Sequence, residues 1–194
     1  MAFFIAVVVR YAASFRACLY MNETTNIFLI GPMGSGKSAV GRRLARELGL
    51  DFYDSDEEIE ARTGVDIPYI FDKEGEAGFR RREANVLREL VELDGIVLAT
   101  GGGAAEDQEN RRLLATHGTV VYLYTSVPEQ LRRTRKSRNR PLLNGGEPGE
   151  VLERLMATRD PQYREIADIV IDTDGRQVAA VTRELKKALD AGPN

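Results

Sequence analysis

The chain contains one cysteine, Cys18, and one histidine, His117, among its 194 residues. A single cysteine excludes an intramolecular disulfide and a zinc site built from cysteines, and it agrees with a reducing compartment. His117 directly precedes Gly118, where we expect a helix to end and a strand to begin. We therefore interpret His117 as a helix-terminal or surface residue and not as a ligand.

The chain also lacks an excess of basic residues and a long apolar run. Lys and Arg total 27 against 30 Asp and Glu, for a net charge of −3. Nucleic-acid binders usually carry a basic excess, so none is indicated here. The apolar run over residues 2–9 is too short for a bilayer, which takes ~20 residues to span. We expect a monomeric, cytoplasmic protein that binds neither nucleic acid nor membrane.

The first twenty residues differ from the rest. They contain no acidic residue and carry Arg10 and Arg16 among apolar side chains. A short transit peptide is one interpretation, because such peptides are poor in acids and contain arginine. Met21 begins a short polar segment that precedes the first expected strand, so we prefer a different interpretation of residues 1–20. Residues 1–20 are interpreted as an extension outside the fold, with a start assigned too far upstream, and residues 21–194 as a single domain.

The stretch GPMGSGKS, residues 31–38, follows the apolar run NIFLI and matches the pattern G-x-x-x-x-G-K-[ST]. Glycines in this pattern let successive backbone N–H groups point at phosphate oxygens. Lys37 would reach the β and γ phosphates, and Ser38 would bind Mg²⁺. The following residues place Val40 and Leu44 on one helical stripe, so a helix N-terminus adds its dipole. The stretch predicts nucleotide binding.

Apolar strands alternate with helical patterns along the rest of the chain. The strands FY, IVLAT, TVVYLYT and DIVIDT join the first one, and each is apolar with little alternation. Such strands indicate a five-stranded parallel sheet with helices on both faces. Ser55 and Glu58 have the spacing of a capping box, and residues 74–95 are predicted as one long helix closed by Gly95.

Ligands of such sheets bind at the carboxyl ends of the strands, where several polar residues should meet. Asp54 ends the second strand and could share the metal, and Asp56 could accept a hydrogen bond from a substrate hydroxyl. The alternative is that both acids only favour the helix N-terminus. Residues 101–103, GGG, would expose backbone N–H groups to a ligand, or simply form a flexible turn. Glu83, three residues after Arg80, could orient its guanidinium, although surface solvation also explains that pair.

Residues 132–140 contain six cations and lead into PLLNGGEPG. A nucleic-acid patch is the rival interpretation, but aromatic residues are not interleaved and the chain is acidic. We predict a mobile lid over about residues 136–148, in which Arg140 contacts the nucleotide phosphates.

Taken in order, the segments GPMGSGKS, FYDSDEEIE, GEAGFRRRE, IVLATGGG, RPLL and RDPQYREIAD resemble shikimate kinase across residues 26–189. The resemblance implies a three-layer P-loop kinase fold with a mobile lid. It also implies transfer of the ATP γ-phosphate to the 3-hydroxyl of shikimate, on the route to chorismate and the aromatic amino acids. ATP is then the co-substrate and Mg²⁺ the cofactor.

The resemblance also assigns residues. The catalytic candidates are Lys37, Asp56 and Arg140, and Ser38 would hold the metal. Asp54 is a second metal candidate because of its position at the end of the second strand. The nucleotide would contact Gly34, Ser35, Gly36, Lys37, Ser38, Ala39, Arg140 and Arg176, with Arg133 as a weaker candidate at the adenine. Shikimate would contact Asp56, Arg80, Gly102 and Arg159. Residues 1–20 match nothing in the family.

Two other functions share these motifs in part. Gluconate and nucleoside-monophosphate kinases have the same phosphate loop and a lid, but the DSD and GGG stretches with two separated arginines favour a small acceptor with hydroxyls and a carboxylate. A non-catalytic sensor would be expected to lose Lys37 or Asp56, and both are present.

Overall fold

A computed structural model describes residues 26–135 and 147–192. The extension over residues 1–20 lies outside these ranges, as does Arg140 with almost all of the predicted lid. Five parallel strands form one sheet in the order β2-β3-β1-β4-β5, which confirms the predicted sheet. The strands are β1 (Asn26–Ile30), β2 (Asp51–Asp54), β3 (Ile96–Ala99), β4 (Gly118–Tyr124) and β5 (Ile169–Asp172).

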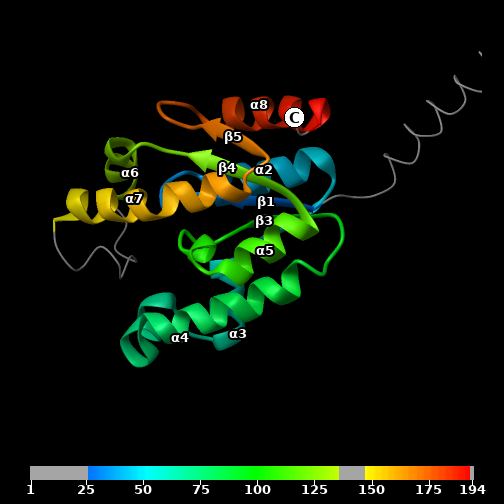
Figure 1. Cartoon of the computed structure of the whole chain (residues 1–194). Coiled ribbons are helices and arrows are strands. Elements are labelled where there is room, and N and C mark those ends of the chain that lie inside the picture. The colour runs from blue at the N-terminus through cyan, green and yellow to red at the C-terminus, as the bar shows by residue number, and fades with distance from the viewer. Residues whose placement is uncertain (1–25, 136–146, 193–194) are drawn as a thin grey trace, which may run out of the picture.

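Helices cover both faces of this sheet (Figure 1). The helices are α2 (Lys37–Leu48), α3 (Ser55–Thr63), α4 (Ile67–Leu90), the 3₁₀ helix η1 (Ala104–Glu106), α5 (Gln108–His117), α6 (Val127–Thr134), α7 (Pro148–Ile166) and α8 (Val178–Ala191). Phe28 and Ile30 of β1 join a core with α3, α4, α5 and α7, whereas Ile27 and Leu29 join a second core with α2 and α8. Successive strand residues point to opposite faces, so two covered faces require continuous apolar runs.

The register of the sheet aligns the ends of three strands. Ala99 of β3 pairs with Leu29 of β1 on one side and with Asp54 of β2 on the other. The loops that follow β1, β2 and β3 therefore leave the sheet at one edge. Among the described residues, 26–135 and 147–192, no helix is both long and apolar enough to cross a membrane.

Two local predictions were wrong. The long helix begins at Ile67, not near residue 74, and continues through Gly75, whose φ of 68° kinks it. It ends at Leu90, not at Gly95. The cap of α3 is Asp54, whose carboxylate accepts a hydrogen bond from the Asp56 N–H, and not Ser55. The Ser55 hydroxyl instead accepts a hydrogen bond from the Gly101 N–H at 2.8 Å, which ties β2 to the glycine segment.

Candidate active site

The phosphate loop spans residues 31–36, between β1 and α2. Gly36 precedes α2 with φ 92°, a left-handed conformation that glycine adopts without steric cost. The first turn of α2 carries no acidic side chain, so its N-terminal N–H groups favour an anion. The Lys37 ammonium lies across the loop and donates to the carbonyls of Gly31 at 2.7 Å and Pro32 at 2.9 Å. The loop thus presents N–H donors and a buried cation to one region of space.

The two predicted metal ligands lie in direct contact. The Ser38 hydroxyl, in the first turn of α2, donates to Asp54 Oδ2 at 2.6 Å. Asp54 is buried at the end of β2, and its other oxygen is occupied by the α3 cap. A hydroxyl and a carboxylate are the hard oxygen donors that suit Mg²⁺, which usually keeps water and phosphate as its other ligands. The residues present therefore fit the cation.

Asp56 lies in the first turn of α3, close to a second buried acid. Its Oδ1 is a buried oxygen with no hydrogen-bond partner among the described residues, and the same is true of Glu83 Oε1. Burial, followed by the nearby negative charges of Glu83 and Asp54, raises the pKa of Asp56 to about 7. A carboxylate with a pKa near neutrality is a better proton acceptor than an ordinary aspartate. Asp56 is therefore suited to act as a base.

The glycine segment that follows β3 brings the acceptor residues together. A methyl group on Gly101 would lie 2.8 Å from Asp56 Oδ1 and closer still to Glu83. One on Gly103 would lie within 3.0 Å of the Arg80 guanidinium. The Tyr163 hydroxyl of α7 donates to the Gly102 carbonyl. The segment is therefore held in place and packed by carboxylates and a guanidinium, and is not a free turn.

Two arginines from distant helices meet beside this segment. Arg80 of α4 donates to Glu83 at 2.7 Å, which confirms the predicted contact between them. Arg159 of α7 is buried, and its Nη1 lies 3.8 Å from the position a Gly102 methyl group would take. Glu106 of η1 lies between the arginines, 2.9 Å from Arg159 Nε and 3.4 Å from Arg80 Nη2. The sequence pattern contained no signal for Glu106 or for the role of Tyr163.

A cavity of about 310 Å³ extends from the phosphate loop to Asp56 and Gly102, whereas the two arginines do not line it. Most of the predicted residues line it, together with Met33 and Thr100. The predicted ones are Gly34, Gly36, Lys37, Ser38, Ala39, Asp54, Asp56 and Gly102. Their convergence on one cavity agrees with a site in which a nucleotide phosphate and an acceptor hydroxyl meet.

The predicted adenine contacts, Arg176 and Arg133, do not line this cavity. Arg176, in the loop after β5, donates to the Asp172 carbonyl at 2.8 Å and pairs with Glu184. Arg133 of α6 donates to the carbonyl of Gly34 at 3.0 Å and so braces the phosphate loop. In this structure, Arg133 is thus a support of that loop.

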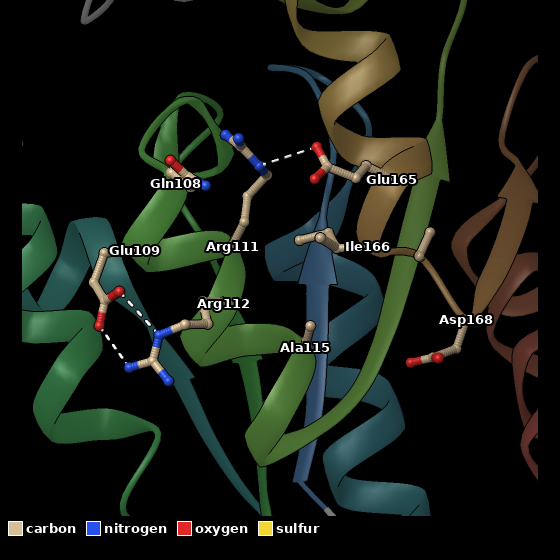
Figure 2. Close-up of a pocket in the computed structure, with 9 residues that line it drawn as sticks. Gln108, Glu109, Arg111, Arg112, Ala115, Glu165, Ile166 and Asp168 are labelled. Atoms are coloured by element: carbon tan, nitrogen blue, oxygen red, sulfur yellow. Dashed lines mark hydrogen bonds and ion pairs between the residues drawn. The ribbon is translucent and has the colours of Figure 1, made fainter.

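A second, larger groove of about 510 Å³ lies between α5 and the end of α7 (Figure 2). Its arginines are matched by acids: Arg112 pairs with Glu109 at 2.7 Å, and Arg111 with Glu165 at 3.2 Å. The groove lacks the phosphate loop and the acceptor residues. Volume alone therefore does not identify the active site.

The fold and the site define a P-loop phosphotransferase, with a phosphate loop, a paired hydroxyl and carboxylate, and a glycine segment flanked by two arginines at one sheet edge. The family model for shikimate kinase matches residues 33–190. The chain belongs to the shikimate kinase family.

Individual relatives agree with this assignment. The chain is 58% identical over 170 residues to a shikimate kinase of Halorhodospira halophila, covering 88% of this chain and 96% of the relative. The shikimate kinase of Acinetobacter baumannii, solved in complex with shikimate, is 49% identical with a TM-score of 0.84, covering 86% of this chain and 93% of that one. A gluconokinase of Sinorhizobium meliloti shares only the fold, with 20% identity, a TM-score of 0.58 and coverage of 87% and 93%.

Proposed function

We propose that this chain transfers the γ-phosphate of ATP to the 3-hydroxyl of shikimate, giving shikimate 3-phosphate and ADP, by means of the residues around the cavity described above. The observation that carries the proposal is the position of Asp56. It lies on the same cavity as the phosphate loop, and a methyl group on Gly101 would meet both Asp56 and Glu83, the partner of Arg80.

The phosphate loop and Lys37 bind the β and γ phosphates of ATP. Ser38 and Asp54 would hold Mg²⁺. When bound, the cation neutralises charge on the phosphate oxygens. Gly34 to Ala39 supply the backbone of the phosphate cradle.

Arg80 and Arg159 bind the carboxylate of shikimate, since a planar guanidinium matches a carboxylate with two parallel hydrogen bonds. Gly102 lets the ring approach the backbone closely. Asp56 accepts the proton of the 3-hydroxyl while the oxygen of that hydroxyl attacks the γ-phosphorus. The bond between this phosphorus and the oxygen that bridges it to ADP breaks. The proton ends on Asp56 and the electron pair of the broken bond on ADP.

Four further assignments do not rest on the contacts described above. Arg140 as a contact of the transferring phosphate lies outside the described residues, and Arg176 as an adenine contact rests on the family resemblance. The monomeric state and the cytoplasmic location remain predictions from composition.

A coupled assay of ADP release tests the proposal against its rivals. The acceptors are shikimate, gluconate and a set of nucleoside monophosphates, each with ATP and Mg²⁺. We expect shikimate to be the only one of these acceptors that is phosphorylated. Turnover with gluconate or a nucleotide in place of shikimate, or ATP binding with no turnover at all, would refute it in favour of another kinase or of a sensor.

The Asp56→Asn variant tests the role of the base. The substitution keeps the shape of the side chain but removes its capacity to take a proton. We expect kcat to fall by roughly 10²- to 10⁴-fold, the usual contribution of general base catalysis, with ATP affinity little changed. Asp51→Asn, at the exposed opposite end of β2, is the matched control and should retain normal turnover.

A further inference from the structure

Glu106 places a carboxylate between the two arginines that would bind the carboxylate of the acceptor. Its Oε1 is 2.9 Å from Arg159 Nε, and its Oε2 is 3.4 Å from Arg80 Nη2. Bridging of two guanidiniums by one carboxylate is the arrangement that the proposed function requires of the substrate. In the structure, the Glu106 carboxylate already bridges the two guanidiniums in this way.

The burial of the arginines explains why a resident anion is needed. The Arg159 side chain is 3% exposed, and Glu106 is the ion-pair partner found for it among the described residues. A buried cation without a partner costs free energy, so Glu106 stabilises the pocket while no acceptor is bound.

Glu106 differs from Glu83 in its freedom to move away, and from Glu76 in contacting both arginines. The Glu83 side chain is 1% exposed and is held in the core, whereas that of Glu106 is 31% exposed. A charged side chain with access to water can leave the arginines at little desolvation cost. Glu76 also contacts Arg80, at 3.0 Å, but no contact joins it to Arg159 among the described ion pairs.

The backbone of Glu106 is anchored while its side chain is free. Arg111 of α5 donates to the carbonyls of Ala105 at 2.7 Å and Glu106 at 3.1 Å. On its other side, Arg111 pairs with Glu165 of α7 at the groove in Figure 2. These contacts tie η1 to the helix that carries Arg159, so the side chain alone needs to move.

We propose that Glu106 is an internal competitor of the acceptor: its carboxylate occupies the Arg80 and Arg159 pair in the empty site and is displaced when the carboxylate of shikimate binds. The inference rests on the proposed function and deepens it. Glu106 thus weakens acceptor binding. It also makes the pocket select for acceptors whose own carboxylate can replace it on the two arginines. It takes no part in phosphoryl transfer.

The Glu106→Gln variant tests the inference, since an amide keeps an acceptor oxygen for Arg159 but loses the competing charge. We expect the KM and the Kd for shikimate to fall by about three- to thirtyfold, because a nearby like charge has been removed. The Kd for ATP and the kcat should stay within about twofold. The methyl ester of shikimate, which is neutral, should gain much less than the acid, because only the acid competes with Glu106.

Glu76→Gln is the matched control, since it removes one carboxylate from Arg80 without affecting Arg159. If it tightens shikimate binding as much as Glu106→Gln does, the effect is general electrostatics and the inference is wrong. Unchanged or weaker shikimate binding in Glu106→Gln would also overturn it, because Glu106 would then be a support and not a competitor.

A thermal melt shows whether Glu106→Gln folds. If it does not, Glu106→Asp is measured instead. Its side chain is one methylene shorter and would reach only one arginine, so shikimate should still bind more tightly than to the natural chain; no tightening refutes the inference.

The natural chain is assayed in parallel. If it phosphorylates shikimate and the variants do not tighten, only the inference fails, whereas no phosphorylation of shikimate refutes the proposed function itself.

Discussion

The Gly103→Ala substitution tests the acceptor pocket with a single methyl group. Gly103 has φ −103° and ψ 1°, which alanine adopts without strain, so the backbone should be unaffected. The added methyl would lie within 3.0 Å of the Cζ, Nη1 and Nη2 atoms of Arg80. A guanidinium is the end of a flexible side chain, but this one is held by Glu83 at 2.7 Å and Glu76 at 3.0 Å. Arg80 must therefore move against its own ion pairs.

The expected loss follows from the hydrogen bonds that Arg80 would make to the acceptor. A charge-assisted hydrogen bond contributes ~1.5 to 3 kcal/mol, which corresponds to a roughly 10- to 150-fold change in binding. A displacement of roughly 1 Å is enough to lose such a contact. We expect the KM for shikimate to rise by about this factor, while the Kd for ATP changes by about twofold or less, since the phosphate loop is not touched.

Steady-state kinetics with each substrate varied in turn, together with direct measurement of nucleotide binding, check this prediction. Gly149→Ala is the matched control, because a methyl group there meets nothing within 4 Å. A normal KM for shikimate in Gly103→Ala would refute the assignment of Arg80 to the acceptor carboxylate. Loss of ATP binding with normal shikimate binding would place Arg80 on the nucleotide side instead.

Three further predictions concern Asp56, Ser38 and residues 1–20. Since burial raises the pKa of Asp56 to about 7, the folded chain holds its proton at pH values where the unfolded chain has lost it. The metal-free protein should therefore lose stability as pH rises from about 4 to 7. In thermal melts over this pH range, the melting temperature should fall less in Asp56→Asn than in the control Asp51→Asn. Equal falls would contradict the burial argument. Ser38→Ala removes one of the two proposed metal ligands, so the Mg²⁺ concentration for half-maximal turnover should rise by roughly tenfold or more, and an unchanged Mg²⁺ titration would exclude Ser38 as a ligand. A chain that begins at Met21 should keep its activity and melting temperature, because residues 1–20 carry no motif of the fold; loss of folding or turnover would show that they belong to it.

Much of the fold could be predicted from local patterns. Apolar runs such as FLI and VLA indicate strands that are covered on both faces, because a strand with one solvated face would alternate. The phosphate loop could be located for a similar reason: the backbone conformation and the cation that bind phosphate are supplied by residues 31–38, which are contiguous. Their order with Asp54, Asp56 and the glycine segment predicted a shared edge, and the cavity confirms that most of them meet there.

Local patterns failed where two signals competed. The long helix was predicted to begin at residue 74, but it begins at Ile67, and Ile70 and Phe79 pack in the same core on either side of the kink at Gly75. Ser55 had the spacing of a cap, yet the Asp54 carboxylate reaches the Asp56 N–H and leaves the Ser55 hydroxyl for Gly101. In both cases the observed conformation comes with a tertiary contact that the local pattern does not contain: the shared core for α4, and the bond from Gly101 to Ser55 for α3.

The sequence by itself determined the parallel sheet and the phosphate loop, because each depends on periodicity or on adjacent residues. The residues of the acceptor pocket were predicted through the resemblance to shikimate kinase. Only the tertiary structure decided how charges from distant segments are shared. Arg80, Glu106 and Arg159 come from α4, η1 and α7, and nothing in their spacing predicts that one carboxylate bridges two guanidiniums. The pKa of Asp56 likewise depends on its burial first, and then on the charge of Glu83, which α4 brings beside it. Electrostatic interactions depend on distance and burial in space, and neither quantity can be obtained from separation along the chain.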